Sequence, residues 1–316
     1  MDDTDLHIVR LLGRDSRTPY KSIASAVGIT TSAAKRRVNK MVSNSVIQRF
    51  VALINPVIFG YEKLCVLVVK DIDKTIKEQD LLKKISLLGN VFAYTEQLEG
   101  AYIFGLYTKD IDQDKIGTLT DLLKPVKVEA LFAAIRPPLP MKILSSDMEI
   151  MKCLLSDARI SVEDTAKETS LSTKTVTRRL EKMRENHVLQ FTISRNLSSL
   201  RLTGYIEFNV LINVEIPRYQ SILERIHREL EEYLLLTPNW YQREVIIVVF
   251  FCANISTAKL ILKRLESYDG VINVESFIST SQSYYLDWLQ NEIDKRMINE
   301  KYLSSSVAAA TTEEGF

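Results

Sequence analysis

An internal repeat constrains the fold of this 316-residue chain more than any other feature. Asp5 and Asp147 lie 142 positions apart, and this spacing holds without a gap for about fifty residues. Identical residues at this spacing are Asp5/Asp147, Ile8/Ile150, Leu12/Leu154, Asp15/Asp157, Arg17/Arg159, Ala24/Ala166, Thr31/Thr173, Arg36/Arg178, Arg37/Arg179, Lys40/Lys182, Met41/Met183, Asn44/Asn186, Val46/Val188 and Gln48/Gln190. A register kept this long indicates a duplicated architecture rather than chance similarity.

The two halves continue in parallel beyond the repeat. Gly60-Tyr61 and Gly204-Tyr205 each precede an apolar strand, and runs of β-branched and aromatic residues then alternate with helical periods. The order βαββαβ is typical of a ferredoxin-like domain. The expected later elements are helices at Thr75–Leu88 and Pro217–Glu232, strand pairs at Val91–Leu98 with Ala101–Tyr107 and Tyr233–Trp240 with Val245–Ala253, helices at Gln113–Leu123 and Ser256–Tyr268, and strands at Val128–Ile135 and Val271–Thr280.

The predicted fold class is therefore α+β, with tandem winged-helix-like helix-turn-helix domains that are each followed by a ferredoxin-like domain. Prolines 137, 138 and 140 forbid a helix between the halves and favour an extended spacer. Each helix-turn-helix domain is called a head below, and each ferredoxin-like domain a sensor domain. The expected domains are a first head at 1–57, a first sensor domain at 58–136, a linker at 137–142, a second head at 143–200, a second sensor domain at 201–290 and a tail at 291–316. An aromatic segment at Tyr284–Leu289 favours a helix that packs on its own domain.

The repeated head has the pattern of a helix-turn-helix unit. A helix with a buried stripe precedes a second helix at Pro19–Val27, and Gly28 supplies a tight turn before a third helix that ends near Ser43. On the third helix Ala34, Val38 and Met41 share one stripe, whereas four basic residues and no acid occupy the helix. The side chains predicted to contact DNA here are Thr31, Ser32, Lys35, Arg36, Asn39 and Lys40.

The second head keeps this layout with a different charge. Glu181 and Glu185 replace Asn39 and Ser43, and a carboxylate repels phosphates although it can accept from a cytosine amino group. The residues predicted to contact DNA are Thr173, Lys174, Thr177, Arg178 and Lys182. A second head with a purely structural role is the alternative.

These motifs resemble the Lrp/AsnC (feast/famine) transcriptional regulators. The similar segments run from "DLHIVRLLGRDSRTPYKSIASAVGITTSAAKRRVNKM" to "GY" in the first half and begin "DMEIMKCLLSDARISVEDTAKETSLSTKTVTRRLEKM" in the second. The resemblance implies a sequence-specific regulator that binds double-stranded DNA, forms homo-oligomers through its ferredoxin-like domains and senses a small-molecule effector. It also implies recognition-helix arginines at Arg36/Arg37 and Arg178/Arg179.

Two departures from the family pattern shape the expected function. Family members carry one head and one sensor domain, so this chain is expected to act as a fused pseudo-dimer whose sensor domains pair face to face within the chain or swap between chains. The glycine-to-aspartate pattern of amino-acid-binding members is missing from both sensor domains. Positions considered for an effector are Glu99, Gly100 and Arg243.

Composition limits other functions. With 41 basic and 40 acidic residues, any affinity for DNA must come from local clustering of charge. Cys65, Cys153 and Cys252 lie far apart in apolar contexts, and the three histidines have no metal-ligand spacing, so neither a metal nor a cofactor is expected. No segment is long and apolar enough for a membrane span, and the acidic N-terminus is unlike a signal peptide, which indicates a cytoplasmic protein.

Two other functions fit parts of this pattern. Sirohaem decarboxylases resemble the same family in fold and place histidine and arginine on the second and third strands of the sensor domain. Those strands hold no histidine here, and Arg243 alone is a poor replacement for groups that transfer protons and bind carboxylates. The chain is therefore predicted not to be an enzyme. The other alternative is an interaction module whose heads have lost DNA binding.

Overall fold

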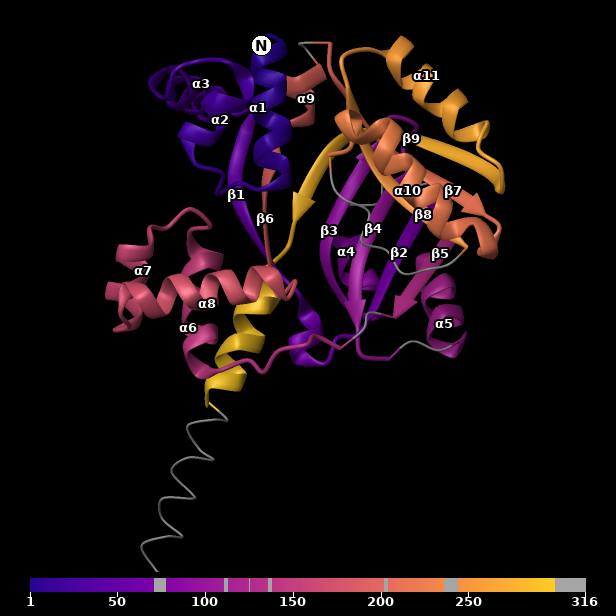
Figure 1. Ribbon diagram of the computed structural model, residues 1–316. Helices are drawn as coiled ribbons and strands as arrows, with labels where there is room; N and C mark the ends of the chain where they lie inside the picture. Colours follow the sequence, from indigo (N-terminus) through magenta and orange to yellow (C-terminus); the bar gives the residue numbers. More distant parts are fainter. Residues whose placement is uncertain are drawn as a thin grey trace, which may run out of the picture.

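The computed structural model describes residues 1–70, 78–110, 113–124, 126–135, 138–201, 204–235 and 244–298. Each half begins with three helices and a strand, and both groups lie on one side of the molecule (Figure 1). In the first head these are α1 (Asp3–Arg14), α2 (Tyr20–Val27), α3 (Thr31–Ser43) and β1 (Ile47–Ile54). In the second they are α6 (Ser145–Ser156), α7 (Val162–Thr169), α8 (Thr173–Glu185) and β6 (Leu189–Arg195).

Strands β1 and β6 pair with each other and join the two heads. They form an antiparallel two-stranded sheet in which Phe50 lies opposite Ile193 and Val51 lies opposite Thr192. At the repeat spacing Phe50 corresponds to Thr192 and Val51 to Ile193, so each strand presents the same positions to its partner. The heads are therefore related by a pseudo-two-fold axis through this ribbon, as in an isologous dimer.

The remaining strands form one seven-stranded sheet in the order β5-β2-β4-β3-β9-β7-β8. The first sensor domain contributes β2 (Lys63–Lys70), α4 (Glu78–Ile85), β3 (Asn90–Gln97), β4 (Tyr102–Thr108), α5 (Gln113–Leu123) and β5 (Lys127–Ile135). The second contributes β7 (Ile206–Val214), α10 (Tyr219–Leu230), β8 (Val245–Cys252), α11 (Ile255–Glu266) and β9 (Val271–Tyr284). Short helices are η1 (Pro56–Phe59), α9 (Leu197–Arg201), η2 (Ile216–Arg218) and η3 (Glu231–Tyr233). Most of the strand expected at 233–240 lies outside the described residues.

The two halves of the sheet face each other inside the chain. On β2, Cys65, Leu67 and Val69 pack beneath the helices of the first sensor domain, whereas Val66 and Val68 point to the opposite face. There they join Leu211, Val245, Ile247 and Phe277 of the second domain in one apolar cluster. Successive side chains of a strand point to opposite faces of the sheet, so this alternation shows that β2 is buried on both faces. The intramolecular form of the expected face-to-face pairing is thus the one observed.

The halves differ at their last strands. β9 is 14 residues long and pairs with β7 along its first part and with β3 along its second part, where Gln97 lies opposite Ser279. β5 has 9 residues and is followed in the sequence by Pro137, Pro138 and Pro140. Because proline has no N–H to donate to a ladder, the sequence after β5 is unsuited to a matching extension. The duplication is therefore asymmetric at the sheet.

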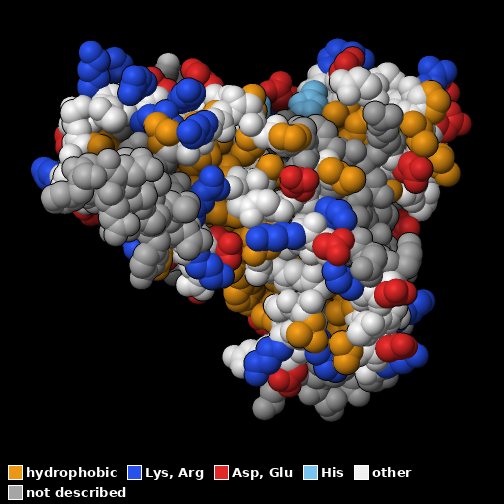
Figure 2. All heavy atoms as spheres, turned by 90° about the horizontal axis from the view of Figure 1, so that it is seen from below, with side chains coloured by type: hydrophobic (Ala, Val, Ile, Leu, Met, Phe, Trp, Pro, Cys, Tyr) orange, Lys and Arg blue, Asp and Glu red, His pale blue; other side chains and the backbone are white. Residues whose placement is uncertain are grey.

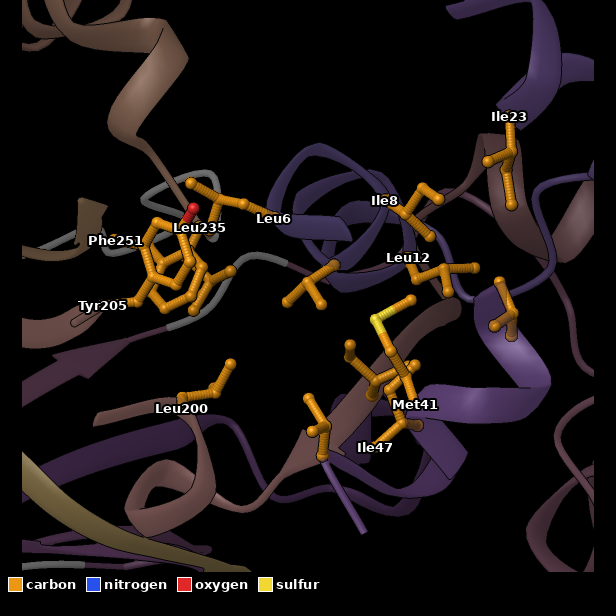
Figure 3. Close-up of a cluster of buried hydrophobic side chains, with 14 of the residues drawn as sticks. Leu6, Ile8, Leu12, Ile23, Met41, Ile47, Leu200, Tyr205, Leu235 and Phe251 are labelled. Carbon is orange, nitrogen blue, oxygen red and sulfur yellow. The ribbon is translucent and has the colours of Figure 1, made fainter. Parts of the chain in front are cut away.

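The first head packs on the second sensor domain. Leu6 and Leu12 of α1 belong to one buried cluster with Tyr205, Leu235 and Phe251 (Figure 3). Arg10 and Arg14 of the same helix donate to the backbone carbonyl groups of Glu232 and Glu231, at 2.7 and 2.5 Å. Apolar and polar contacts together fix the orientation of this head.

The second head packs instead on a helix at 287–298 that has no counterpart in the first half. Leu289 and Ile293 of this helix are fully buried in the core of the second head, and Lys152 of α6 forms an ion pair with Asp294 at 2.7 Å. A C-terminal helix was expected from the aromatic segment, but on its own sensor domain. It also crosses the expected boundary between the second sensor domain, which ends at 290, and the tail, which begins at 291.

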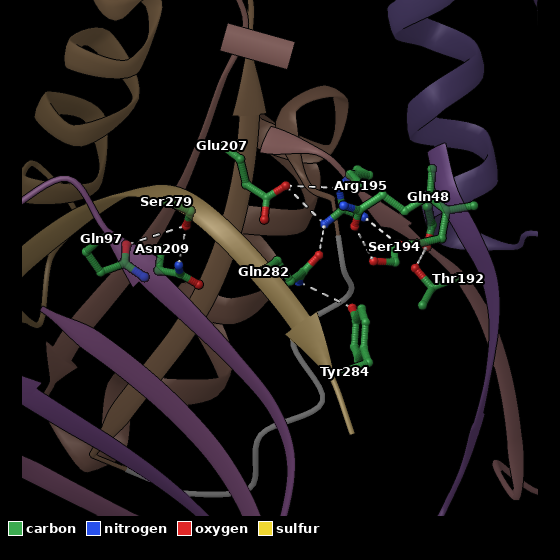
Figure 4. A network of polar contacts seen from close by, with 12 residues as sticks. Gln48, Gln97, Thr192, Ser194, Arg195, Glu207, Asn209, Ser279, Gln282 and Tyr284 are labelled. Atoms are coloured by element: carbon green, nitrogen blue, oxygen red, sulfur yellow. Dashed lines mark hydrogen bonds and ion pairs between the residues drawn. The ribbon is translucent and has the colours of Figure 1, made fainter. Parts of the chain in front are cut away.

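A buried polar network connects the ribbon to the sheet (Figure 4). Arg195 on β6 has no exposed side-chain surface; it bonds to Glu207 of β7 at 3.0 Å and to Gln282 of β9 at 3.1 Å. Burial is the largest single influence and opposes ionisation of this guanidinium, but the charge and hydrogen bond of Glu207 together with Tyr284 outweigh it and raise the pKa of Arg195. Because a buried charge is costly without its partner, the network fixes the ribbon against the second sensor domain.

Candidate nucleic-acid interface

Helix α3 buries one face and exposes the other. Thr30 caps its N-terminus by accepting from the backbone N–H of Ala33 at 3.2 Å, and the side chains of Ala34, Val38 and Met41 are buried against α1 and α2. The six residues predicted to contact DNA in this head are all exposed: Thr31, Ser32, Lys35, Arg36, Asn39 and Lys40. They lie on one helix, along the side opposite the core.

Helix α8 repeats this arrangement. Ser172 caps it through the backbone N–H of Thr175 at 3.1 Å, and Val176, Leu180 and Met183 are buried. The five residues predicted to contact DNA in the second head are exposed: Thr173, Lys174, Thr177, Arg178 and Lys182. Glu181 and Glu185 are exposed as well. The outward surface of α8 therefore combines positive and negative side chains, whereas that of α3 carries no carboxylate.

Arg37 and Arg179 do not belong to these outward surfaces, although the family resemblance grouped them with Arg36 and Arg178. Arg37 donates to Asp2 and Asp5, both at 2.8 Å, and hydrogen bonds to these carboxylates raise the pKa of Arg37. Arg179 is buried and forms a two-fold hydrogen-bonded ion pair with Asp147. In both heads this arginine ties the third helix to the first. Its structural role explains why the pair recurs at the repeat spacing.

Side chains between the heads hold them together at the ribbon. Arg17 donates to the carbonyl of Ala158 at 2.9 Å. The guanidinium of Arg159 lies over the rings of Tyr20 and Phe50, with its Cζ atom 4.7 and 4.8 Å from the two ring centroids. Burial, followed by the nearby charge of Arg184, lowers the pKa of Arg17. These contacts join the two heads beside the ribbon.

Basic side chains are concentrated in the heads, although the chain as a whole is nearly neutral. Blue lysine and arginine side chains gather on the left of Figure 2, in the region of the heads, with fewer red carboxylates among them. Helix α3 contains Lys35, Arg36, Arg37 and Lys40 and no acidic residue. Because Arg37 is paired with Asp2 and Asp5, the unpaired positive charge on the exposed face of α3 comes from Lys35, Arg36 and Lys40, in a chain whose net charge is only +1.

Of the three positions considered for an effector, the structure places Glu99 and Gly100. Glu99 and Gly100 lie in the exposed turn between β3 and β4, where Gly100 has a φ of +77° and a Cβ added to it would meet nothing within 4 Å. Arg243 lies outside the described residues. Sequence reasoning had no signal that this turn would be open to solvent.

Comparisons with known proteins identify both heads. Residues 1–42 match the model of the AsnC-type helix-turn-helix domain, and residues 144–190 match that of a winged helix-turn-helix DNA-binding domain. Together with the fold, these matches define a protein with two winged helix-turn-helix units on paired ferredoxin-like domains. The first head and the related proteins described below make this chain similar to regulators of the Lrp/AsnC type.

The related proteins are shorter regulators. An uncharacterised HTH-type transcriptional regulator of Pyrococcus furiosus is 36% identical over 91 residues, which cover 29% of this chain and 60% of that protein. The HTH-type transcriptional regulator LrpA of Pyrococcus horikoshii is 34% identical over 61 residues, which cover 19% of this chain and 43% of that protein. The chain thus spans less than two thirds of the length of these relatives in each alignment.

One solved structure matches the architecture over nearly the whole length. The sirohaem decarboxylase NirDL superposes with a TM-score of 0.50 and 12% identity, and the match covers 96% of this chain and 99% of that one. At this identity the likeness shows the fold alone. The three histidines here are His7 on α1, His187 before β6 and His227 on α10, so none lies on a strand of the sensor sheet. No helix within the described ranges is long and apolar enough to cross a membrane.

Proposed function

We propose that this protein is a transcriptional regulator that binds double-stranded DNA through both heads as a fused pseudo-dimer. The observation that carries the proposal is the pair of third helices, each with its apolar face buried and with every predicted DNA-contacting side chain exposed. In helix-turn-helix proteins the third helix enters the major groove, and lysine and arginine neutralise phosphates. The antiparallel ribbon presents the two helices about a pseudo-two-fold axis, which suits two half-sites on one face of a duplex.

The two heads would read different half-sites. Asn39 of α3 can bond to adenine, whereas Glu181 of α8 can accept from the amino group of cytosine and repels phosphates. The preferred operator is therefore an imperfect palindrome, with tighter binding to the half-site of the first head. A regulator of this kind needs no catalytic group, and we infer that the chain is not an enzyme because the sensor strands supply no histidine for general acid–base work.

Binding and its symmetry are tested in one experiment. Duplexes selected from a random library by the wild-type protein should yield two unequal half-sites. The double variant Glu181→Asn with Glu185→Ser replaces both outward carboxylates of α8 with the residues that α3 has at those positions, so its selected duplexes should become more palindromic. A strictly palindromic site for the wild type would contradict the unequal heads.

The assignment of residues to the groove is tested by single substitutions. Arg36→Ala and Arg178→Ala should each weaken binding by roughly 5- to 150-fold, as for one base or phosphate contact, and reduce the salt slope of log K by about 1. Lys259→Ala on α11 removes an exposed lysine far from the heads and serves as the control. Unchanged affinity in both arginine variants would remove these helices from the interface. It would favour an interaction module without DNA binding.

We also propose that copies of the chain assemble further through their sensor domains. β5 is an end strand of the seven-stranded sheet, and its last residue, Ile135, is 69% exposed. End strands with exposed apolar side chains readily pair with another chain. Light scattering should give a mass above that of one chain, and Ile135→Lys should lower it.

A further inference from the structure

An open groove of about 340 Å³ lies between the first head and helix α8 of the second. One wall comes from α8, through Thr177, Glu181 and Glu185, which are exposed residues on the outward side of that helix. Arg17 of the first head lines the same groove, together with Phe191 of β6. A side chain of the first head therefore borders the surface through which the second head is proposed to contact DNA.

Contacts with the second head hold the guanidinium of Arg17 at this groove. One of its nitrogens donates to the backbone carbonyl of Ala158 at 2.9 Å, and its Cζ atom lies 5.4 Å from the ring centroid of Phe191. The guanidinium of Arg184 lies over the same ring, with its Cζ atom 5.6 Å from the centroid. Because a guanidinium has five N–H groups, Arg17 keeps donors for a further acceptor.

The positive charge of Arg17 has no counter-charge of its own. Among the residues that the structure describes, Arg17 forms no ion pair, whereas Arg184 is paired with Asp15 at 2.5 Å. Burial, followed by the nearby charge of Arg184, lowers the pKa of Arg17. An anion beside this guanidinium would oppose both effects, because an opposite charge favours the ionised form.

The outward surface of α8 is less positive than that of α3. On α8 three cations accompany two carboxylates, whereas α3 has three outward cations and no carboxylate: Lys174, Arg178 and Lys182 with Glu181 and Glu185, against Lys35, Arg36 and Lys40. Neither Glu181 nor Glu185 forms an ion pair within the described ranges of the chain. A phosphate near the groove is therefore repelled by these carboxylates and attracted by Arg17.

A helix in the major groove has a sugar-phosphate strand along each flank, since the groove is about 12 Å wide and a helix with its side chains measures about 10–12 Å. Thr177 and Glu181 mark the flank of α8 that borders Arg17. We propose that Arg17, although part of the first head, contacts a backbone phosphate of the half-site that α8 reads. This inference rests on the proposed function. The contact ties the position of one head to the half-site of the other.

Arg159, the counterpart of Arg17 at the repeat spacing, is held differently. Its guanidinium lies over the rings of Tyr20 and Phe50 and donates to the Tyr20 hydroxyl at 3.2 Å. The counterpart of Tyr20 in the second head is Val162, which has neither a ring nor a hydroxyl to engage Arg17. The contact across the heads is therefore expected at the half-site of α8 and not at that of α3.

Arg17→Met and Arg159→Met are matched variants, because each removes a guanidinium at the same position of the repeat. Both are titrated at several salt concentrations with the unequal duplex selected by the wild-type protein. Arg17→Met should weaken binding about ten-fold and reduce the salt slope of log K by about 1, whereas Arg17→Lys should keep the slope. Arg159→Met should leave the slope unchanged. An unchanged slope in Arg17→Met, or an equal loss in both methionine variants, would overturn the proposal.

Methylphosphonate substitution, which removes the charge of one phosphate at a time, locates the contact. One such substitution in the half-site of α8 should weaken binding of the wild-type protein about ten-fold and have little further effect on Arg17→Met. The half-site of α8 is the one whose preferred sequence changes in the double variant Glu181→Asn with Glu185→Ser. A phosphate coupled to Arg17 in the half-site of α3 would contradict the contact across the heads. Circular dichroism melts establish that each variant is folded.

These outcomes separate the two proposals. A wild-type protein that binds no duplex would overturn the proposed function. A wild-type protein that binds, with Arg17→Met equal to it in affinity and salt slope, would overturn only the contact of Arg17 with DNA.

Discussion

The duplicated arginine–aspartate pair allows the same substitution to be made in two environments. In the second head Asp147 has no exposed side-chain surface and Arg179 is 8% exposed, whereas in the first head Arg37 is 32% exposed. Arg179→Met leaves the Asp147 carboxylate buried without a counter-charge, which typically costs about 3–5 kcal/mol. Arg37→Met breaks a solvent-screened pair and should cost at most about 1 kcal/mol.

Hydrogen exchange of the head amides measures these costs separately, because each head can open locally. Arg179→Met should accelerate exchange in the core of α6 and α8 by roughly 150- to 4,000-fold, whereas Arg37→Met should accelerate exchange in α1 and α3 by about five-fold at most. The double variant Asp147→Leu with Arg179→Met removes both charges and should restore most of the protection. Equal acceleration in the two heads, or a double variant as labile as Arg179→Met, would refute this account.

Three further predictions concern other parts of the molecule. Ser170 ends α7 in the left-handed conformation (φ 54°), where the first head has Gly28, so Ser170→Gly should stabilise the second head by about 1 kcal/mol in denaturant titrations. Arg225, Arg264 and the Tyr268 hydroxyl hold the pKa of Glu229 at about 2, below its ordinary 4.5, so the stability that this carboxylate contributes is complete above about pH 4.5 and is lost as the pH falls through about 2. Acid melts of Glu229→Gln should lack this component. Removing residues 286–316 uncovers the apolar groups that pack on Leu289 and Ile293 and should destabilise the second head by about 3–6 kcal/mol, seen as selective proteolysis of that head.

Local structure was predicted well from the sequence where apolar residues recur at helical spacing and an N-cap residue stands before them. The spacing of Ala34, Val38 and Met41, with threonine at the cap, is enough to place α3 and its buried face. It also separates Lys35 and Arg36 from the core, because a helix has one register once its apolar stripe is known.

Pairings between distant segments were beyond sequence reasoning. Nothing in the strand at 47–54 indicates that its partner is the strand at 189–195, since alternation fixes which face is buried and not which strand lies alongside. The inward direction of Arg37 was missed because a residue at the margin of a helical stripe can turn either way. The available signal was the recurrence of both Asp5 and Arg37 at the repeat spacing, which is what a structural pair in each head would leave.

The structure separates what the duplication kept from what it changed. The ribbon keeps equivalent residues opposite each other, so its two strands are related as in a symmetric dimer. The supports of the heads differ, because Arg10 bonds to the second sensor domain whereas its counterpart Lys152 bonds to the C-terminal helix. A substitution in that helix that breaks its contacts with α6 would therefore act on the second head and leave the contacts of Arg10 and Arg14 unchanged. In a symmetric homodimer such one-sided control would be impossible at the level of sequence, since each change would occur in both subunits.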